Sequence, residues 1–416
     1  MRGVASVLAI AIAAAGVLPA AAADSGQRRS IPATIRIATF NCSLNRASQG
    51  ELLRDLSTPD SAQARAVAEI IQRVRPDILL LQEFDYDAAG ESMRLFQSNY
   101  LAVPQDEQAP VEFRYTFSAE SNTGVPSGFD LDHDGRIGGG GDALGFGEFP
   151  GQYGMALFSR FPIDGDRARA FRKFLWRDMP GALLPEGWYS PVALAALPLS
   201  SKSHWDVPVR IGSRTLHVLA SHPTPPAFDG PEDRNGRRNH DEIRFWNDYL
   251  SGGRYLRDDA GRRGGFGGGR FIIMGDQNSD PVDGGSLNDA IAALLANPRV
   301  NSRFVPASAG APQAAAEQGG ANATQHGDAR NDTADFNDRV AGNLRVDYLL
   351  PSRDVSVCGG GVFWPARDEP EARLVWGDAP PPSSDHRLVW LDVSVTTGRC
   401  PPGSDPTASA PSHPRR

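Results

Sequence analysis

Polar side chains follow several apolar segments of this sequence, at points where strands are expected to end. Asn41 follows the first apolar run, Glu83 follows the second, and His222 follows a later one. Further along the chain, Asp276 and Asn278 follow another apolar run, Asp347 lies within one, and Asp385 and His386 precede the last one. Because α/β folds gather their sites at the carboxyl ends of strands, we expect these side chains to meet at one sheet edge.

Such a set of side chains is suited to the hydrolysis of a phosphate ester. Carboxylate and amide oxygens are the ligands that a hard cation such as Mg²⁺ or Mn²⁺ prefers. A bound cation polarises a phosphoryl oxygen and offsets negative charge in the transition state. A histidine held by an aspartate can accept or donate a proton near neutral pH. No closely spaced Cys and His ligands occur, so a structural zinc site is not expected.

Each of these residues has a plainer interpretation when it is taken alone. A glutamate such as Glu83 after a strand is usually a solvated turn residue, residues 275–276 can form a simple turn, and His222 precedes a proline. Asp347 is harder to dismiss, because it lies in the apolar segment RVDYLL, where an ionised carboxylate is costly unless paired or metal-bound. The hypothesis of a functional site therefore depends on all these residues occurring together, and not on any one of them.

The segments that must position these residues alternate between strand-like and helix-like patterns. Strands are expected at 34–40, 77–81, 154–159, 192–199, 205–211, 215–220, 271–274, 344–350, 355–358 and 388–395, and helices at 61–74, 91–99, 237–250 and 287–295. Residues 306–333 are rich in Ala, Gly and Gln and are expected to form a mobile loop. Consecutive strands between 192 and 220 favour an α/β sandwich with packed sheets.

The first 23 residues have the pattern of a signal peptide, with Arg2, an apolar run at 4–18 and small residues at 21–23. A membrane anchor is the alternative, but the run is short and rich in alanine. We expect a secreted or periplasmic protein without a membrane span, and a monomer. Residues 24–33 are expected to be a flexible lead, 34–398 the domain, and 399–416 a disordered tail rich in Pro and Ser.

In an oxidising compartment, two of the cysteines can form a disulfide. Among three cysteines, Cys358 and Cys400 flank the terminal strands and are the predicted pair, whereas Cys42 is predicted to be a buried free thiol.

The formal net charge is −8, which gives no broad basic surface for nucleic acid. Bound divalent cations can supply the positive charge that a phosphate needs, so a nuclease is not excluded.

The order of short motifs along the chain is more specific than any one of them. These motifs are TFN around Asn41, LQE ending at Glu83, GMALFSRFPI at 154–163, SHP around His222, GDQN at 275–278, RVDYLL around Asp347 and SDH at 384–386. Together they resemble the endonuclease/exonuclease/phosphatase superfamily over residues 34–395. The resemblance implies a four-layer α/β/β/α sandwich with two central, mostly antiparallel sheets, and a metal-dependent phosphoric ester hydrolase.

The resemblance also implies a role for each site residue. Glu83 would be the principal metal ligand with Asn41 beside it, and Asp385 would be a second ligand or support the first. Asp276 and Asn278 would position the attacking water and the scissile phosphate. Asp347 and His386 would be an aspartate–histidine dyad at the phosphate, and His222 would donate to a phosphate oxygen or aid departure of the leaving group. The choice of general base between His386 and Asp276 stays open.

The expected substrate is a phosphodiester, either nucleic acid or a small molecule. A phosphomonoester or a phospholipid is the second choice. A catalytically inactive, calcium-stabilised binding protein is an alternative of another class, but no position of the motif set has lost its ligand atom. The loop after His222 is long, and its Arg234, Arg237 and Arg238 could contact substrate or cap the following helix.

An insertion at 130–142 reads DLDHDGRIGGGGD and matches the first half of a calcium-binding loop. Asp130, Asp132 and Asp134 alternate before a glycine that allows a sharp turn. Gly141 stands where the twelfth-position glutamate is expected, so Asp142 would have to reach the ion through the flexible glycines. An acidic surface loop is the alternative, and we favour a weak structural Ca²⁺ site.

Overall fold

Two β-sheets form the centre of the domain in a computed structural model that describes residues 33–377, 381–395 and 399–402. The first sheet has the order β12 (Ser356–Val362), β13 (Val389–Ser394), β1 (Ile35–Leu44), β2 (Ile78–Phe84), β4 (Met155–Ser159) and β3 (Tyr115–Phe117). The second has the order β11 (Asp347–Pro351), β8 (Arg270–Asp276), β7 (Arg214–Ser221), β6 (His204–Ile211) and β5 (Arg169–Ala170). A short ribbon pairs β9 (Ala334–Asp335) with β10 (Asn343–Leu344).

Each large sheet contains one parallel pair, β1 with β2 and β7 with β8, and its other pairs are antiparallel. The helices are α1 (Glu51–Leu56), α2 (Ala62–Val74), α3 (Glu91–Phe96), α4 (Pro191–Leu194), α5 (Arg234–Leu250), α6 (Asp289–Leu295) and α7 (Gly310–Gln318). A π-helical turn at Gln97–Leu101 extends α3, and 3₁₀ turns lie at Gly140–Asp142, Gly165–Arg167, Trp176–Asp178, Gly320–Thr324, Ala329–Asn331 and Pro370–Leu374.

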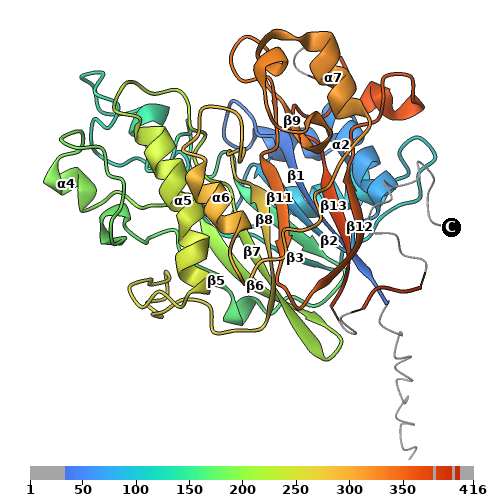
Figure 1. Cartoon of the computed structure of the whole chain (residues 1–416), viewed down its shortest axis with the longest axis horizontal. Helices are drawn as coiled ribbons and strands as arrows, with labels where there is room; N and C mark the ends of the chain where they lie inside the picture. Colours follow the sequence, from blue (N-terminus) through green and yellow to red (C-terminus); the bar gives the residue numbers. More distant parts are fainter. Residues whose placement is uncertain (1–32, 378–380, 396–398, 403–416) are drawn as a thin grey trace, which may run out of the picture. The chain divides into compact units, whose positions relative to one another are not determined.

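The alternation of side chains along β8 separates the layers. Ile272 and Met274 belong to the core that includes the first sheet and α2, whereas Phe271 and Ile273 pack with the apolar faces of α5 and α6. Because successive strand residues point to opposite faces, β8 lies between two cores. Figure 1 shows α5 and α6 side by side over β7 and β8, with α2 beside the first sheet. The predicted four-layer sandwich with mostly antiparallel sheets is confirmed.

Two predicted segments have a different structure. Residues 192–199 were expected to form a strand, but α4 begins in this region because Ser190 accepts a hydrogen bond from the Ala193 amide and a proline starts the helix. Residues 306–333 were expected to be a mobile loop, yet they contain α7, whose Ala311 and Ala314 are buried. Alanine favours helix, and the absence of a side chain at Gly310 lets the start of this helix lie close to Trp364.

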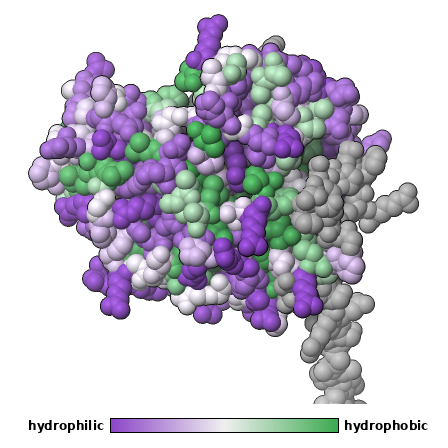
Figure 2. Space-filling model, viewed as in Figure 1, coloured by the Kyte–Doolittle hydropathy of each residue, from purple (hydrophilic) through white to green (hydrophobic). Residues whose placement is uncertain are grey.

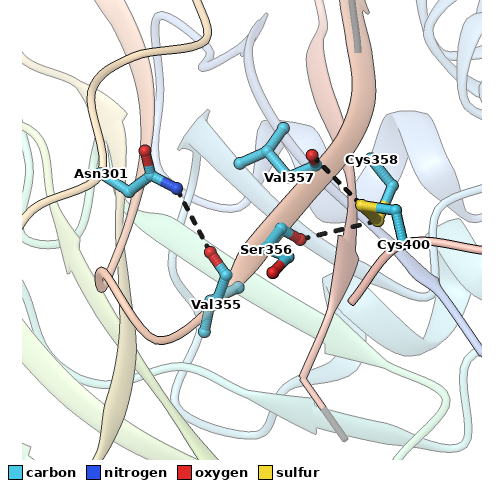
Figure 3. The surroundings of a disulfide bond; sticks show 6 residues. All are labelled: Asn301, Val355, Ser356, Val357, Cys358 and Cys400. Atoms are coloured by element: carbon cyan, nitrogen blue, oxygen red, sulfur yellow. Dashed lines mark hydrogen bonds between the residues drawn. A yellow bond between two sulfur atoms is a disulfide. The ribbon is translucent and has the colours of Figure 1, made fainter. Parts of the chain in front are cut away.

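Cys358 of β12 and Cys400 form a disulfide, as predicted, and Cys42 is a buried free thiol. Figure 3 shows Cys400 against β12, with its sulfur 3.4 Å from the Val357 carbonyl oxygen. The disulfide therefore fixes the chain that follows β13 to the edge strand of the first sheet.

We expect Cys400→Ser to lower the free energy of unfolding by about 2–4 kcal/mol, because the bond closes a loop with a sequence separation of 42 residues in the unfolded chain. Urea unfolding with and without reductant measures this effect. Reductant should bring the wild type to the stability of Cys400→Ser and leave the variant unchanged. Equal stability of both proteins without reductant would contradict the prediction.

The predicted signal peptide at 1–23 and most of the predicted tail lie outside the described residues. Within the described ranges, no helix is long and apolar enough to cross a membrane. On the face shown in Figure 2, hydrophilic residues predominate and hydrophobic residues form small groups.

Candidate active site

The predicted site residues come together where the two sheets meet. Asn41 and Glu83 lie near the carboxyl ends of the parallel strands β1 and β2. His222 follows β7, Asp276 ends β8, and Asp347 begins β11. Asp347 is paired in register with Asp276, so the antiparallel ladder places the two carboxylates side by side. Both sheets therefore contribute to one group of side chains, as the sequence predicts.

The Asp276 carboxylate is at the centre of this group. Its Oδ2 lies 3.1 Å from Asn41 Nδ2, 3.4 Å from His222 Nε2 and 3.6 Å from His386 Nε2. Its Oδ1 accepts a hydrogen bond of 2.7 Å from the Asn278 amide. Only a glycine fits before it, because a Cβ on Gly275 would lie 2.0 Å from the Ser221 carbonyl oxygen. One buried carboxylate thus contacts nitrogen atoms from three other segments and from its own.

Asp347 and His386 form the predicted dyad. Asp347 Oδ2 lies 2.9 Å from His386 Nδ1 and accepts a hydrogen bond of 2.8 Å from the Thr333 hydroxyl. Its Oδ1 is buried and has no hydrogen-bond partner among the described residues. Phe336 packs edge-on against the imidazole. The dyad therefore turns Nε2 of His386 toward Asp276, and it leaves one carboxylate oxygen available to a further ligand.

Glu83 is linked to this centre through Asn41. Asn41 Nδ2 donates both to Glu83 Oε1 and to Asp276 Oδ2, each at 3.1 Å. Glu83 has a positive φ of 55°, and Ser43 and Asn278 have positive φ values of 48° and 50°. Left-handed backbone is costly for such residues and is often retained at functional sites. The strand ends are therefore shaped to direct side chains inward, at a cost in stability.

The remaining predicted residues lie at the margin of the site. Asp385 Oδ1 accepts a hydrogen bond of 3.2 Å from the Ser43 hydroxyl. Burial raises the pKa of Glu83, and the charge of Asp385 adds to this effect. Asn278 Nδ2 donates to the Pro223 carbonyl oxygen at 3.2 Å, which ties the segment after β8 to the loop after β7. Asp385 therefore supports the Glu83 side of the site, and Asn278 supports the His222 side.

The protonation states differ between the two histidines. Burial lowers the pKa of the His386 imidazole, but the carboxylates of Asp347 and Asp276 outweigh burial and raise that pKa to about 10. Burial, with the positive charges of Lys202 and His386, holds the pKa of His222 well below its ordinary value. Burial raises the pKa of Asp276 to about 7. At neutral pH the site therefore holds one cationic and one neutral imidazole.

The arrangement fits a divalent cation. Glu83 and Asp276 each direct a carboxylate oxygen at the same nitrogen of Asn41, so the space between them attracts positive charge. Ligand atoms of Asp276, Asp347 and His386 lie within 4.8 Å of one another, and one oxygen of Asp347 is without a partner. Asn41 presents its donor nitrogen rather than the oxygen expected of a metal ligand. Glu83, Asp276 and Asp347 are therefore the candidate carboxylate ligands.

Sequence reasoning missed Lys202, which lies just before β6. This lysine is only 6% exposed, and its ammonium makes no hydrogen bond or ion pair with the described residues. Burial lowers its pKa, and the charges of Glu242, Glu83 and Asp276 oppose that effect. An unpaired buried ammonium is costly, so its position near two site carboxylates calls for an anionic partner such as a phosphate.

We expect Lys202→Met to lower kcat/KM for a phosphodiester by roughly 10- to 100-fold, because a hydrogen-bonded charge at a reacting group contributes a few kcal/mol. The same change should leave the melting temperature equal or higher, because it removes an unpaired buried charge. The matched control is Lys173→Met at an exposed position. Unchanged turnover together with lower stability would assign Lys202 a purely structural role.

The three arginines after His222 are held by hydrogen bonds and an ion pair within the chain. Arg238 is buried and donates to the carbonyl oxygens of Leu199 and Pro198 at 2.8 and 3.0 Å. Arg234 pairs with the Glu232 carboxylate, and Arg237 Nε donates to the Glu232 carbonyl oxygen at 3.1 Å. These contacts favour the alternative in which the arginines hold the start of α5, rather than contact substrate.

Comparison with known proteins shows what this chain is similar to. The model of the Endonuclease/Exonuclease/phosphatase family matches residues 38–386, while no curated protein matches the chain. Among solved structures, the chain is similar to an endonuclease/exonuclease/phosphatase from Beutenbergia cavernae DSM 12333, with 16% identity, 88% of this chain and 72% of that chain covered, and a TM-score of 0.48.

Two further structures share this similarity. A family protein from Leptotrichia buccalis C-1013-b is 13% identical, with 86% and 98% of the two chains covered and a TM-score of 0.44. Sphingomyelinase C from Streptomyces griseocarneus is 13% identical, with 86% and 99% covered and a TM-score of 0.42. Because the family model spans most of the chain, the expected resemblance is confirmed. The chain belongs to the Endonuclease/Exonuclease/phosphatase family, whose members are metal-dependent phosphoric ester hydrolases.

Proposed function

We propose that this chain is an exported phosphodiesterase that uses Mg²⁺ or Mn²⁺ to hydrolyse a phosphodiester outside the cytoplasm. The observation that carries the proposal is the position of the Asp276 carboxylate between Asn41, His222 and His386. Such a centre offers a proton acceptor and two imidazoles within reach of one phosphate. When bound, the cation would polarise a phosphoryl oxygen and offset its charge.

Different side chains assist the attack of water on phosphorus and the departure of the alcohol. Asp276 orients a water molecule and takes its proton as the water oxygen forms a bond to phosphorus. Protonated His386, held by Asp347, stabilises the negative charge that gathers on the phosphoryl oxygens. The bond to the ester oxygen breaks on the opposite side, and the neutral imidazole of His222, 3.4 Å from Asp276, relays the proton taken up by Asp276 to the departing alkoxide. The products are a phosphomonoester and an alcohol.

The pKa values favour Asp276 over His386 as the general base, a choice that the sequence left open. A base must be unprotonated near the operating pH. The raised pKa of His386, about 10, keeps the imidazole protonated at neutral pH, whereas the pKa of Asp276, about 7, allows ionisation there. His386 is therefore assigned the role of an electrostatic stabiliser.

Hydrolysis of bis-p-nitrophenyl phosphate and p-nitrophenyl phosphate tests the proposed activity. We expect turnover with Mg²⁺ or Mn²⁺, a preference for the diester, and loss of activity in EDTA that either metal restores. Failure to hydrolyse any ester with Mg²⁺, Mn²⁺ or Ca²⁺ would support the alternative of an inactive binding protein. Export is tested by the N-terminal sequence of protein recovered outside the cytoplasm, which should begin at Asp24.

We also propose a structural Ca²⁺ site in the insertion at 130–142. Ligand atoms of Asp130, Asp132 and Asp134 lie within 4.8 Å of one another, and Oδ1 of Asp130 is buried with no hydrogen-bond partner in the described part of the chain. Asp142 does not join them, contrary to expectation, because its two oxygens accept hydrogen bonds of 2.6 and 2.8 Å from the amides of Leu131 and Gly138. Asp142 instead closes the loop around the three aspartates.

We expect 10 mM CaCl₂ to raise the melting temperature of the wild type by about 2–3 °C, from a Kd of about 10⁻⁴ to 10⁻³ M. Asp132→Ala should abolish this rise and have little effect in EDTA. The control is Asp142→Ala, which should destabilise the protein equally with calcium and with EDTA because it removes bonds to the backbone. An identical shift for Asp132→Ala in both conditions would discard the calcium proposal.

A further inference from the structure

Asp332 is a buried carboxylate that the proposed reaction does not use. It follows the 3₁₀ turn Ala329–Asn331 and is only 6% exposed. Its Oδ2 has no hydrogen-bond partner in the part of the chain that the structure describes, and its carboxylate forms no ion pair there. An ionised carboxylate in such surroundings is costly unless a cation or a set of donors accompanies it. Asp332 therefore lacks the partner that its burial requires.

Three other aspartates surround this carboxylate. Asp280 and Asp283 belong to the loop after β8, and Asp328 lies in the same segment as Asp332. Burial, followed by the charges of these three aspartates, raises the pKa of Asp332 to about 8. Arg330 pairs with Asp328, whereas Asp280, Asp283 and Asp332 form no ion pair within the described ranges. The cluster therefore attracts a cation from solution.

Backbone contacts bring the two parts of this cluster together. Asp280 Oδ2 and Thr333 Oγ1 accept hydrogen bonds from the consecutive amides of residues 345–346, at 2.8 and 3.0 Å. Asp283 Oδ2 accepts a hydrogen bond of 2.7 Å from the Gly327 amide. The loop after β8 and the segment 326–333 therefore meet around Asp332.

The spacing of the carboxylates indicates which ion fits. No three of them bring ligand atoms within 4.8 Å of one another, in contrast to the groups at the active site and in the insertion. Ca²⁺ takes six to eight oxygen ligands directly, so it suits a tighter cluster. Mg²⁺ dehydrates reluctantly and is bound through one or two carboxylates with several water molecules. A hydrated Mg²⁺ ion therefore matches the wider spacing.

We propose that Asp332 binds a hydrated Mg²⁺ ion whose water molecules donate hydrogen bonds to Asp280 and Asp283. Both of these aspartates already accept backbone amide hydrogens, and their remaining lone pairs can accept from water. The ligand Asp332 is distinct from the candidate carboxylate ligands of the active site. The ion joins the loop after β8 to the segment that ends in Thr333, whose hydroxyl donates to Asp347 at 2.8 Å. This second cation therefore helps to hold the catalytic dyad in place.

Thermal unfolding of the wild type and Asp332→Asn at pH 8.5 tests the proposal. At this pH, which is above the pKa of about 8, the Asp332 carboxylate is ionised without metal. In EDTA the variant should melt about 2 °C higher than the wild type, because the substitution removes an unpaired buried charge. MgCl₂ at 10 mM should raise the melting temperature of the wild type by about 2 °C more than that of the variant. Mg²⁺ bound at other sites contributes equally to both proteins.

The matched control is Asp368→Asn, which removes one exposed carboxylate. Its melting temperature should rise with Mg²⁺ as much as that of the wild type, and NaCl of equal ionic strength should not reproduce the difference between the wild type and Asp332→Asn. An equal Mg²⁺-induced rise in the wild type and Asp332→Asn would overturn the proposal.

Trypsin digestion of the wild type provides a test that needs no variant. Arg330, whose side chain is 68% exposed, lies two residues before Asp332, and cleavage after it requires the segment to open locally. Mg²⁺ should slow this cleavage by about fivefold relative to NaCl of equal ionic strength, and it should leave cleavage at the exposed Arg339 unchanged. Mass spectrometry of the fragments over time measures both rates. A rate at Arg330 that Mg²⁺ does not change would likewise overturn the proposal.

Discussion

We expect Glu83→Gln to lower kcat for bis-p-nitrophenyl phosphate by about 10³-fold or more. The substitution keeps an oxygen that can accept the Asn41 hydrogen bond, and it removes only the charge that would hold the divalent cation. Loss of the charge stabilisation that a cation provides costs several kcal/mol in the transition state, which corresponds to this factor. Steady-state kinetics at saturating Mn²⁺ measures the change.

The matched control for this variant is Glu186→Gln, which removes one negative charge at an exposed position. Its kcat should be within about twofold of the wild type, because an exposed charge far from the reacting atoms is screened by solvent. The melting temperature of Glu83→Gln should not fall, since burial raises the pKa of this carboxyl and makes its charge unfavourable. Full activity of Glu83→Gln would remove Glu83 from the site.

His386→Ala should lower kcat by about 10²- to 10⁴-fold, the range associated with a positioned acid–base group. Because Asp347 holds the imidazole through the 2.9 Å contact with His386, Asp347→Ala should cost less activity when it is added to His386→Ala than it costs alone. Kinetics of the two single variants and the double variant measure this coupling. Multiplicative losses would show that the two residues act independently.

The same variant has an expected effect on the pH dependence of stability. The folded-state pKa of His386 is raised from 6.5 to about 10, so its contribution to stability is fully present below pH 6.5 and is lost as pH rises toward 10. The EDTA-treated wild type should therefore lose stability between pH 7 and pH 10, as measured by urea unfolding. This decline should be smaller in His386→Ala, and an equal decline would contradict the assigned protonation state.

Much of the fold and the site could be predicted because both depend on local pattern. Apolar runs ending in polar residues located β1, β2, β7 and β8, and the order of the motifs indicated which strand ends would meet. The disulfide between Cys358 and Cys400 followed from their places beside the terminal strands. These features are encoded within a few residues of where they act, so a single sequence is enough to find them.

The features that were missed depend on tertiary contacts. Residues 192–199 carry enough Val and Leu for a strand, but the cap at Ser190 and the following proline start a helix there. Thr333 lies in a segment expected to be mobile, and its contact with Asp347 is set by backbone hydrogen bonds to Leu344 and Arg387, which are distant in the sequence. One signal could have identified Lys202, since lysine occurs only twice in the chain, here and at Lys173.

The calcium-loop prediction shows the same limit. The spacing of Asp130, Asp132 and Asp134 correctly placed three carboxylates together. It could not show that Asp142 would be recruited by the amides of Leu131 and Gly138, because backbone donors compete with an ion for the same oxygens.

Titration of Mn²⁺ into the EDTA-stripped protein, followed by electron paramagnetic resonance, tests most directly whether the two sheets share one cation. Glu83→Ala removes the candidate metal ligand that the first sheet supplies. Asp276→Asn removes the charge of the candidate ligand that the second sheet supplies. We predict that each variant weakens the same Mn²⁺ site by about tenfold or more. A Mn²⁺ affinity that is unchanged in either variant would contradict a shared metal site.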